Sequence, residues 1–150
     1  MSYIFVAMAN LTAREEDYLE TIYRLAGVAE TVGVTDVAKA RQVTVPTARA
    51  AVAKLARYGL IRKEYYGKIT LRSSGRKRAE EIYAMHRALL RFLREVLLLT
   101  PEIAEREACR MEHGLSKETL RRLVLFLEAW ESSDKRDSSC LKIYQEAIAR

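Results

Sequence analysis

The residues best suited to chemistry lie in the stretch Glu107-Ala108-Cys109-Arg110-Met111-Glu112-His113. On a helix, Cys109, Glu112 and His113 stand at positions i, i+3 and i+4, so one face presents a thiol, a carboxylate and an imidazole. These are three kinds of metal ligand within about a turn and a half. Taken alone, the run also fits a buried small residue beside a surface ion pair, so its spacing suggests a metal site without fixing one.

The charge of the chain is distributed unevenly. Residues 37–78 contain twelve Lys and Arg residues against one acid, Glu64, whereas the remainder holds 14 basic and 19 acidic residues, for a net charge of +6. A basic block beside an acidic partner is typical of nucleic-acid binding. A soluble basic face without a partner is the plainer alternative.

Composition places the chain among ordinary globular proteins. Of its 150 residues, 49% are hydrophobic and 31% charged, enough to bury an apolar core. Two cysteines do not form a disulfide framework, which favours a reducing compartment. The apolar start, residues 1–8, is too short for a membrane span and lacks a basic leader. We therefore expect a cytoplasmic protein that does not enter the membrane.

The first half of the chain carries the signals of a helix-turn-helix. Thr12 and Glu15 form a capping box that predicts a helix over 13–26, ending before Gly27. Thr35 is the expected cap of a short helix over 36–41. After a turn, Thr44 is the expected cap of a helix that runs to about residue 58, with Pro46 in its first turn. Two short helices around a tight turn, the second rich in small and basic residues, predict DNA binding in the major groove.

A change of period follows this helix pair. Residues 60–66 and 68–72 flank Gly67 and predict a basic hairpin, which would complete a winged helix-turn-helix.

The second half is predicted to be helical throughout. A long helix is expected over 73–98, with His86 in its apolar stripe, where a backbone hydrogen bond is the ordinary explanation for a histidine. Thr100 and Pro101 start the helix of the metal-ligand run, and Ser116 caps the last one. That last helix carries a broad apolar band, which predicts a subunit interface and hence a homodimer; its members are Leu120, Leu123, Val124, Phe126, Leu127 and Trp130.

Three features together resemble one family. The run Glu16-Asp17-Tyr18-Leu19-Glu20-Thr21-Ile22-Tyr23, the winged helix and the stretch 107–113 are similar to the diphtheria-toxin-repressor family of metal-dependent transcriptional repressors, including its manganese-transport-regulator branch. The likeness covers roughly residues 11 to 130. It implies a mainly α fold, with an N-terminal winged helix-turn-helix followed by an all-helical metal-binding and dimerisation domain. The chain ends too early for the SH3-like domain of the iron-type members, so the short form is expected.

The resemblance also implies a ligand set. The iron branch would use Cys109, Glu112 and His113, with Asp17 at a methionine position. The manganese branch would use Asp17, Glu20, His86, Glu112 and His113, with a glutamate at the position of Cys109. The sequence thus combines both branches, and the full expected set is Asp17, Glu20, His86, Cys109, Glu112 and His113.

A second, ancillary site of the iron branch would need an acid and an imidazole where Leu90 and Glu105 stand, so we expect it to be lost or rebuilt. The expected metal is Fe(II), then Mn(II), with Zn(II) or Co(II) possible because of the thiolate. A metal that joins ligands before and after the winged helix would restrain the position of that DNA-binding domain. In a dimer, the two recognition helices must lie about 34 Å apart to enter successive major grooves.

The resemblance and the charge pattern also predict the contacts to double-stranded operator DNA. Base-reading positions are expected at the start of the second helix of the helix-turn-helix: Thr44, Pro46, Thr47, Arg49 and Ala50. Phosphate contacts are expected from Lys54, Arg57, Lys63, Lys68 and Arg72, with Tyr66 at the wing.

The expected organisation is an extension over 1–10, a DNA-binding domain over 11–75, a metal-binding and dimerisation domain over 76–131, and a polar linker and tail over 132–150. The main alternative function keeps the fold but replaces the metal signal by a small organic ligand or an oxidant sensed at Cys109. A hydrolytic metalloenzyme is a remote alternative because no separate general base can be named, so we expect no enzyme activity.

Overall fold

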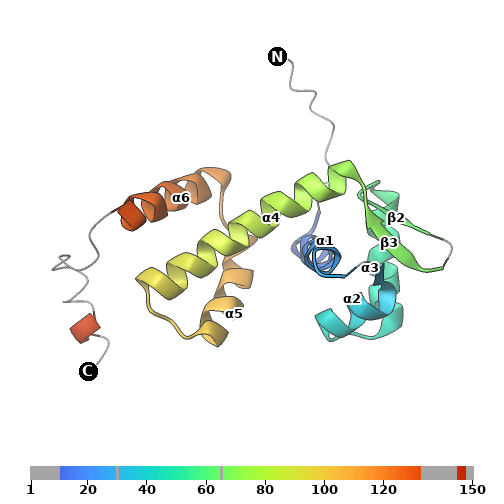
Figure 1. Cartoon of the computed structure of the whole chain (residues 1–150), viewed down its shortest axis with the longest axis horizontal. Coiled ribbons are helices and arrows are strands. Elements are labelled where there is room, and N and C mark those ends of the chain that lie inside the picture. Colours follow the sequence, from blue (N-terminus) through green and yellow to red (C-terminus); the bar gives the residue numbers. More distant parts are fainter. Residues whose placement is uncertain (1–10, 30, 65, 133–144, 148–150) are drawn as a thin grey trace, which may run out of the picture. The chain divides into compact units, whose positions relative to one another are not determined.

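The computed structural model describes residues 11–29, 31–64, 66–132 and 145–147 (Figure 1). The predicted N-terminal extension, and all of the predicted linker and tail except Ser132 and residues 145–147, lie outside this part. The chain divides into two compact units, Met1–Ala84 and Met85–Arg150, each of which is described by itself.

The first helix of the first unit, α1 (Ala13–Ala26), begins as its capping box predicts. The Thr12 backbone N–H donates to Glu15 Oε2 at 2.9 Å, and the Glu15 backbone N–H donates to the Thr12 hydroxyl at 3.3 Å. These bonds satisfy amides that a helix start leaves without partners. Gly27 ends the helix, which confirms the predicted bounds.

The helix-turn-helix consists of α2 (Val34–Arg41) and α3 (Val45–Arg57). Thr44 caps α3 and accepts from the Thr47 N–H, as predicted. The predicted cap of α2 was wrong, because the helix starts earlier, after Gly33. There the Asp36 carboxylate accepts the Gly33 N–H at 2.8 Å, so it reaches back to the amide of the cap residue, whereas the cap itself has no side chain to accept an amide ahead of it.

The predicted hairpin is present as β2 (Ile61–Lys63) and β3 (Lys68–Leu71). Gly67 adopts a φ of 77°, which glycine reaches without strain. A third strand, β1 (Val32–Gly33), pairs with the other edge of β3, so the sheet order is β1-β3-β2, all antiparallel. Two residues are too few to show an alternating pattern, so the sequence did not predict β1.

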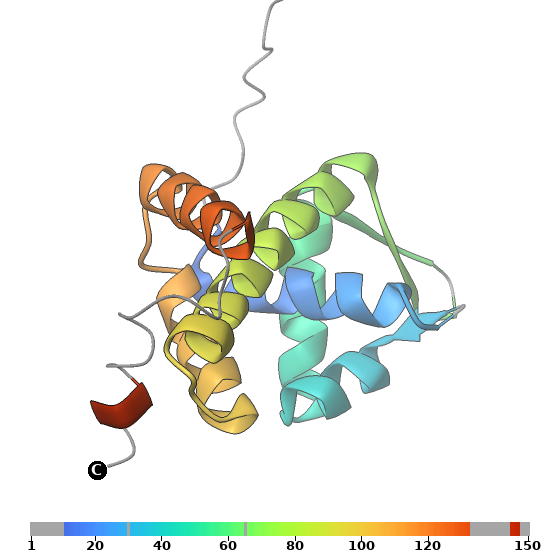
Figure 2. The ribbon, with the colours of Figure 1, turned by 60° about the vertical axis from the view of Figure 1, so that its left-hand side comes forward.

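Helices and sheet enclose one apolar core in the first unit. Figure 2 shows α1, α2 and α3 gathered beside the strands. The core residues come from all of these elements and include Leu19, Ile22, Val37, Val52 and Ile61. This core buries one face of α3 and leaves the opposite face exposed.

Helix α4 (Ser73–Arg91) begins in the first unit and ends in the second. Gly75 is required near its start, since a Cβ there would lie 1.9 Å from the Leu60 carbonyl oxygen. The predicted single helix over 73–98 is interrupted, because Phe92–Val96 form a π-helical segment, η1. Leu98 follows with a φ of 56°, which ends the helical run.

The second unit also contains α5 (Pro101–Glu112) and α6 (Lys117–Ser132). Thr100 caps α5 as predicted. Leu89 and Leu93 pack against Ala104 and Ala108, which recur one helical turn apart on α5. Because alanine is small, α5 can approach α4 closely and carry its C-terminal residues to the α4 side chains.

None of the helices in the described ranges is long and apolar enough to cross a membrane.

Candidate metal centre and nucleic-acid interface

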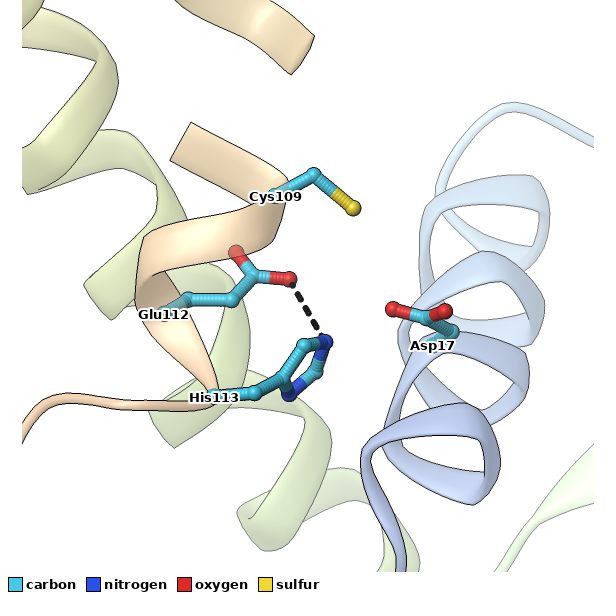
Figure 3. A group of neighbouring side chains, drawn as sticks. All are labelled: Asp17, Cys109, Glu112 and His113. Carbon is cyan, nitrogen blue, oxygen red and sulfur yellow. Dashed lines mark ion pairs between the residues drawn. The ribbon is translucent and has the colours of Figure 1, made fainter. Parts of the chain in front are cut away.

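The last turn of α5 brings the predicted ligand run together. Cys109 and Glu112 lie on α5, and His113 is its C-terminal cap (Figure 3). One ligand atom from each lies within 4.8 Å of the others, which confirms the common face predicted from the spacing. Cys109 and His113 are half-buried, whereas Glu112 is buried.

The Glu112 carboxylate is the centre of this group. Its Oε2 lies 2.7 Å from His86 Nδ1, and its Oε1 lies 3.4 Å from His113 Nε2, the ion pair dashed in Figure 3. Within the described part of the chain, Oε1 is a buried atom that accepts no hydrogen bond. A buried carboxylate oxygen normally has a donor or a cation. This oxygen, which has an ion pair with His113 but no hydrogen bond among the described residues and lies beside a thiol, therefore fits a bound divalent cation.

His86 on α4 faces a carboxylate at each ring nitrogen. Besides Glu112 at Nδ1, Glu105 Oε1 lies 3.2 Å from Nε2. The sequence-based expectation of a backbone partner was thus wrong, whereas the need for a partner is confirmed. A neutral imidazole has one N–H and can donate to only one of the two carboxylates, so a second proton or a metal is needed to satisfy both contacts.

Asp17 and Glu20 belong to α1 in the first unit. Asp17, also drawn in Figure 3, forms an ion pair with Arg41, while Glu20 Oε1 lies 3.7 Å from the Arg24 guanidinium. Glu20 is only 6% exposed. The place of both residues in a metal centre remains a prediction from the resemblance.

Donor chemistry limits what the α5 group can do. Carboxylate and imidazole suit Mn(II) and Fe(II), and a thiolate favours Fe(II), Co(II) or Zn(II). The group therefore suits a transition metal better than Ca²⁺ or Mg²⁺, which prefer oxygen ligands throughout.

The predicted DNA-reading helix α3 has two distinct faces. Ala48, Val52 and Leu55 are buried in the core. The predicted contacts Pro46, Arg49, Ala50, Lys54 and Arg57 are all exposed. The helix thus presents short and basic side chains on a rigid base, as insertion into a major groove requires.

Not all predicted contacts are equally available. The Thr44 and Thr47 hydroxyls lie 2.8 Å apart within the α3 cap, and Lys54 Nζ lies 3.3 Å from Glu15 Oε1. This ion pair links the recognition helix to α1. Lys54 must share its charge between Glu15 and any phosphate, so it is a weaker candidate for a DNA contact than Arg49.

The wing presents further predicted contacts. Lys63 and Arg72 are exposed, Lys68 is half-buried, and Tyr66 beside the turn is 96% exposed. Basic side chains and one aromatic ring at a hairpin tip suit phosphate and groove contacts.

Sequence reasoning missed the side chains that pair over long distances. Three pairs join residues on different elements: Glu105 with His86, Arg41 with Asp17, and Arg78 with Glu16. Their local sequence contains no signal for such pairs, because surface-helix positions with charged residues are common.

Two family models match the chain. Residues 10–69 match the iron-dependent repressor N-terminal DNA-binding domain, and residues 72–140 match the iron-dependent repressor metal-binding and dimerisation domain.

Individual proteins agree with these matches. The chain is 36% identical to an uncharacterised HTH-type transcriptional regulator of Methanocaldococcus jannaschii, over 77% of this chain and 94% of the relative. It is 32% identical to the diphtheria toxin repressor of Corynebacterium diphtheriae, over 81% of this chain and 54% of that protein. The solved structure of the manganese regulator SloR matches with a TM-score of 0.70 at 30% identity, over 79% of this chain and 55% of that one. The chain thus spans about half the length of the latter two.

Proposed function

This chain belongs to the iron-dependent repressor family, and on that premise we propose that it is a metal-dependent transcriptional repressor that binds operator DNA as a dimer when loaded with Fe(II) or Mn(II). One observation carries this proposal: the buried Glu112 Oε1, which lacks a hydrogen bond within the described residues, lies beside Cys109 and His113. A repressor that senses metal needs a centre whose ligands are already positioned, and a buried carboxylate oxygen without a hydrogen bond favours a cation at that position.

The proposed ligands fall into two groups. Cys109, Glu112 and His113 are supported by their proximity on α5, and His86 by its contact with Glu112. Asp17 and Glu20 are proposed on the sequence resemblance alone. A bound cation supplies the positive charge that offsets the repulsion among these carboxylates and between them and DNA. Metal shifts DNA affinity only as far as it binds the DNA-competent state more tightly.

The proposed DNA-reading surface is the exposed face of α3 together with the wing. Arg49 is the best candidate for a base contact, because an arginine fork matches the guanine edge in the major groove. Ala50 offers only a methyl group, so its contact would be apolar. Arg57, Lys63, Lys68 and Arg72 are proposed to bind phosphates, which fixes the register without reading sequence.

We further propose that α6 contributes to the dimer. Val124, Leu125 and Phe126 are 37%, 49% and 44% exposed. Phe126 also packs against Phe92 and Trp130, with ring centroids 6.1 Å apart in both pairs. This aromatic cluster gives the apolar band a rigid base, as an interface needs. We also propose that the protein acts in the cytoplasm and that it binds DNA without catalysing a reaction.

A DNA mobility shift tests the function as a whole. Wild-type protein is mixed anaerobically with a DNA ligand selected from a random pool, in chelator or with Fe(II), Mn(II), Co(II) or Zn(II). We expect a shifted band with Fe(II) or Mn(II) and its loss in chelator. Equal binding in chelator would favour the alternative regulator that answers to an organic ligand or an oxidant. Calorimetry for each metal ranks Fe(II) against Mn(II), and tighter Mn(II) binding would reverse the expected order.

A further inference from the structure

Asp17 is paired with a cation from the helix-turn-helix. The Arg41 guanidinium donates to Asp17 Oδ2 at 2.6 Å, and the side chains are 29% and 16% exposed. The same guanidinium lies 5.6 Å from the centre of the Tyr18 ring. A short charge-assisted bond and an aromatic face together hold Arg41 in place.

The position of Arg41 connects this pair to DNA recognition. Arg41 is the last residue of α2, and Gln42 follows in the left-handed conformation at the turn before α3. Asp17 lies in the second turn of α1. The ion pair therefore joins a proposed metal ligand to the helix-turn-helix within one compact unit.

A guanidinium and a divalent cation are competitors for one carboxylate. An oxygen that accepts a charge-assisted bond has less negative charge to offer a metal, and two cations side by side repel each other. We propose that Arg41 is the internal counter-cation of Asp17, which a divalent metal must displace, so that Arg41 sets the metal concentration at which the protein responds. This inference rests on the proposed function, in which Asp17 is a ligand.

Metal affinity is the direct test. Arg41→Gln removes the competitor, and Lys39→Gln removes one positive charge from an exposed residue in the same last turn of α2. Calorimetry with Mn(II) should show tighter binding by Arg41→Gln on the order of tenfold, the ratio that matches one charge-assisted hydrogen bond. Lys39→Gln should change the affinity by less than about twofold, because its charge is exposed and screened.

A double-mutant cycle separates competition from a general field effect. In an Asp17→Asn background, Arg41→Gln should no longer change Mn(II) affinity, since its target carboxylate is gone. The same cycle on metal-free protein, followed by thermal unfolding, should give non-additive losses of stability. Arg41→Lys, which keeps the charge but not the planar fork, should give an intermediate affinity and guards against misfolding of the glutamine variant.

The outcomes separate the two proposals. Equal affinities for Arg41→Gln and Lys39→Gln, or a gain that persists in the Asp17→Asn background, would overturn the role of Arg41 and leave the repressor function standing. Failure of wild-type protein to bind Mn(II) or Fe(II) would overturn the proposed function and this inference together.

Discussion

Replacing Glu112 by glutamine tests the metal centre through the stability of the protein. The side chain is 1% exposed, so the change acts inside the structure. A buried oxygen without a hydrogen-bond donor costs about 1–3 kcal/mol of stability, and more when it is charged. Glutamine removes the charge and therefore the charged part of this cost. It also weakens the bond to His86 from charge-assisted to neutral, a loss of about 1 kcal/mol. Because these effects oppose each other, metal-free Glu112→Gln should unfold within about 1 kcal/mol of wild type.

Metal should stabilise wild-type protein much more than Glu112→Gln. A cation at a hundred times its Kd stabilises wild type by about 2.7 kcal/mol, a rise in Tm on the order of 10 °C for a chain of this length. Loss of a direct ligand should weaken binding by about a hundredfold or more, since even supporting residues of metal sites cost 10–100-fold. At the same metal concentration the variant should then gain only about 0.4 kcal/mol. Anaerobic thermal unfolding followed by circular dichroism, with chelator or Mn(II), measures both quantities.

Glu102→Gln is the matched control, because Glu102 is an exposed carboxylate in the first turn of the same helix. It should keep the full metal-induced rise in Tm. A similar rise in Glu112→Gln would refute the assignment of Glu112 as a ligand. A large loss of metal-free stability in that variant would instead show that the carboxylate is structural.

Three further predictions concern the first unit. Gly75→Ala should destabilise the protein by about 3 kcal/mol or more, measured by urea unfolding, because the new Cβ meets the Leu60 carbonyl. Arg49→Ala should weaken binding to selected DNA by about 1–3 kcal/mol and binding to random DNA far less, as fluorescence anisotropy would show. Glu15→Gln should remove stability at neutral pH but not in acid, measured by urea unfolding at both. The Thr12 backbone N–H lowers the pKa of the Glu15 carboxyl, so its contribution is present above the unfolded-state pKa and lost as the pH falls through the lower folded value.

Each of these has a contrary result. Gly27→Ala is the control for Gly75→Ala, because a Cβ at Gly27 would lie no closer than 3.4 Å to another residue. Equal free energies of unfolding for the two variants would contradict the close contact at Gly75. Equal losses on selected and random DNA would exclude a base-reading role for Arg49. A stability difference between wild type and Glu15→Gln that is as large in acid as at neutral pH would contradict a charged capping interaction.

The elements that sequence reasoning predicted well are those marked by local bonds. Thr12, Thr44 and Thr100 each accept from an amide three residues ahead, so the signal and the structure lie within one turn. β1 and the π-helical η1 depend on pairing and packing with distant residues, and the local sequence gives no sign of either. The helix repeat likewise placed Cys109, Glu112 and His113 on one face.

The remaining parts of the site depend on tertiary contacts. Arg41 meets Asp17 across 24 positions in the chain, and His86 meets Glu112 across 26. Such pairs follow from how helices pack, which the local pattern does not specify. Glu105 shows the same limit, because only the structure places its carboxylate against His86.

Coupling between the metal centre and DNA binding is measured most directly by the ratio of DNA affinity with metal to that in chelator, determined by fluorescence anisotropy on one selected DNA for wild type and Glu112→Gln. We predict that Fe(II) or Mn(II), at a concentration that saturates wild-type protein but not the variant, raises the DNA affinity of wild-type protein at least about fivefold, the lower end of coupling between sites. The same concentration should raise the DNA affinity of Glu112→Gln far less, because the variant binds the metal more weakly. The same ratio in both proteins, or a ratio of one in wild type, would contradict this prediction.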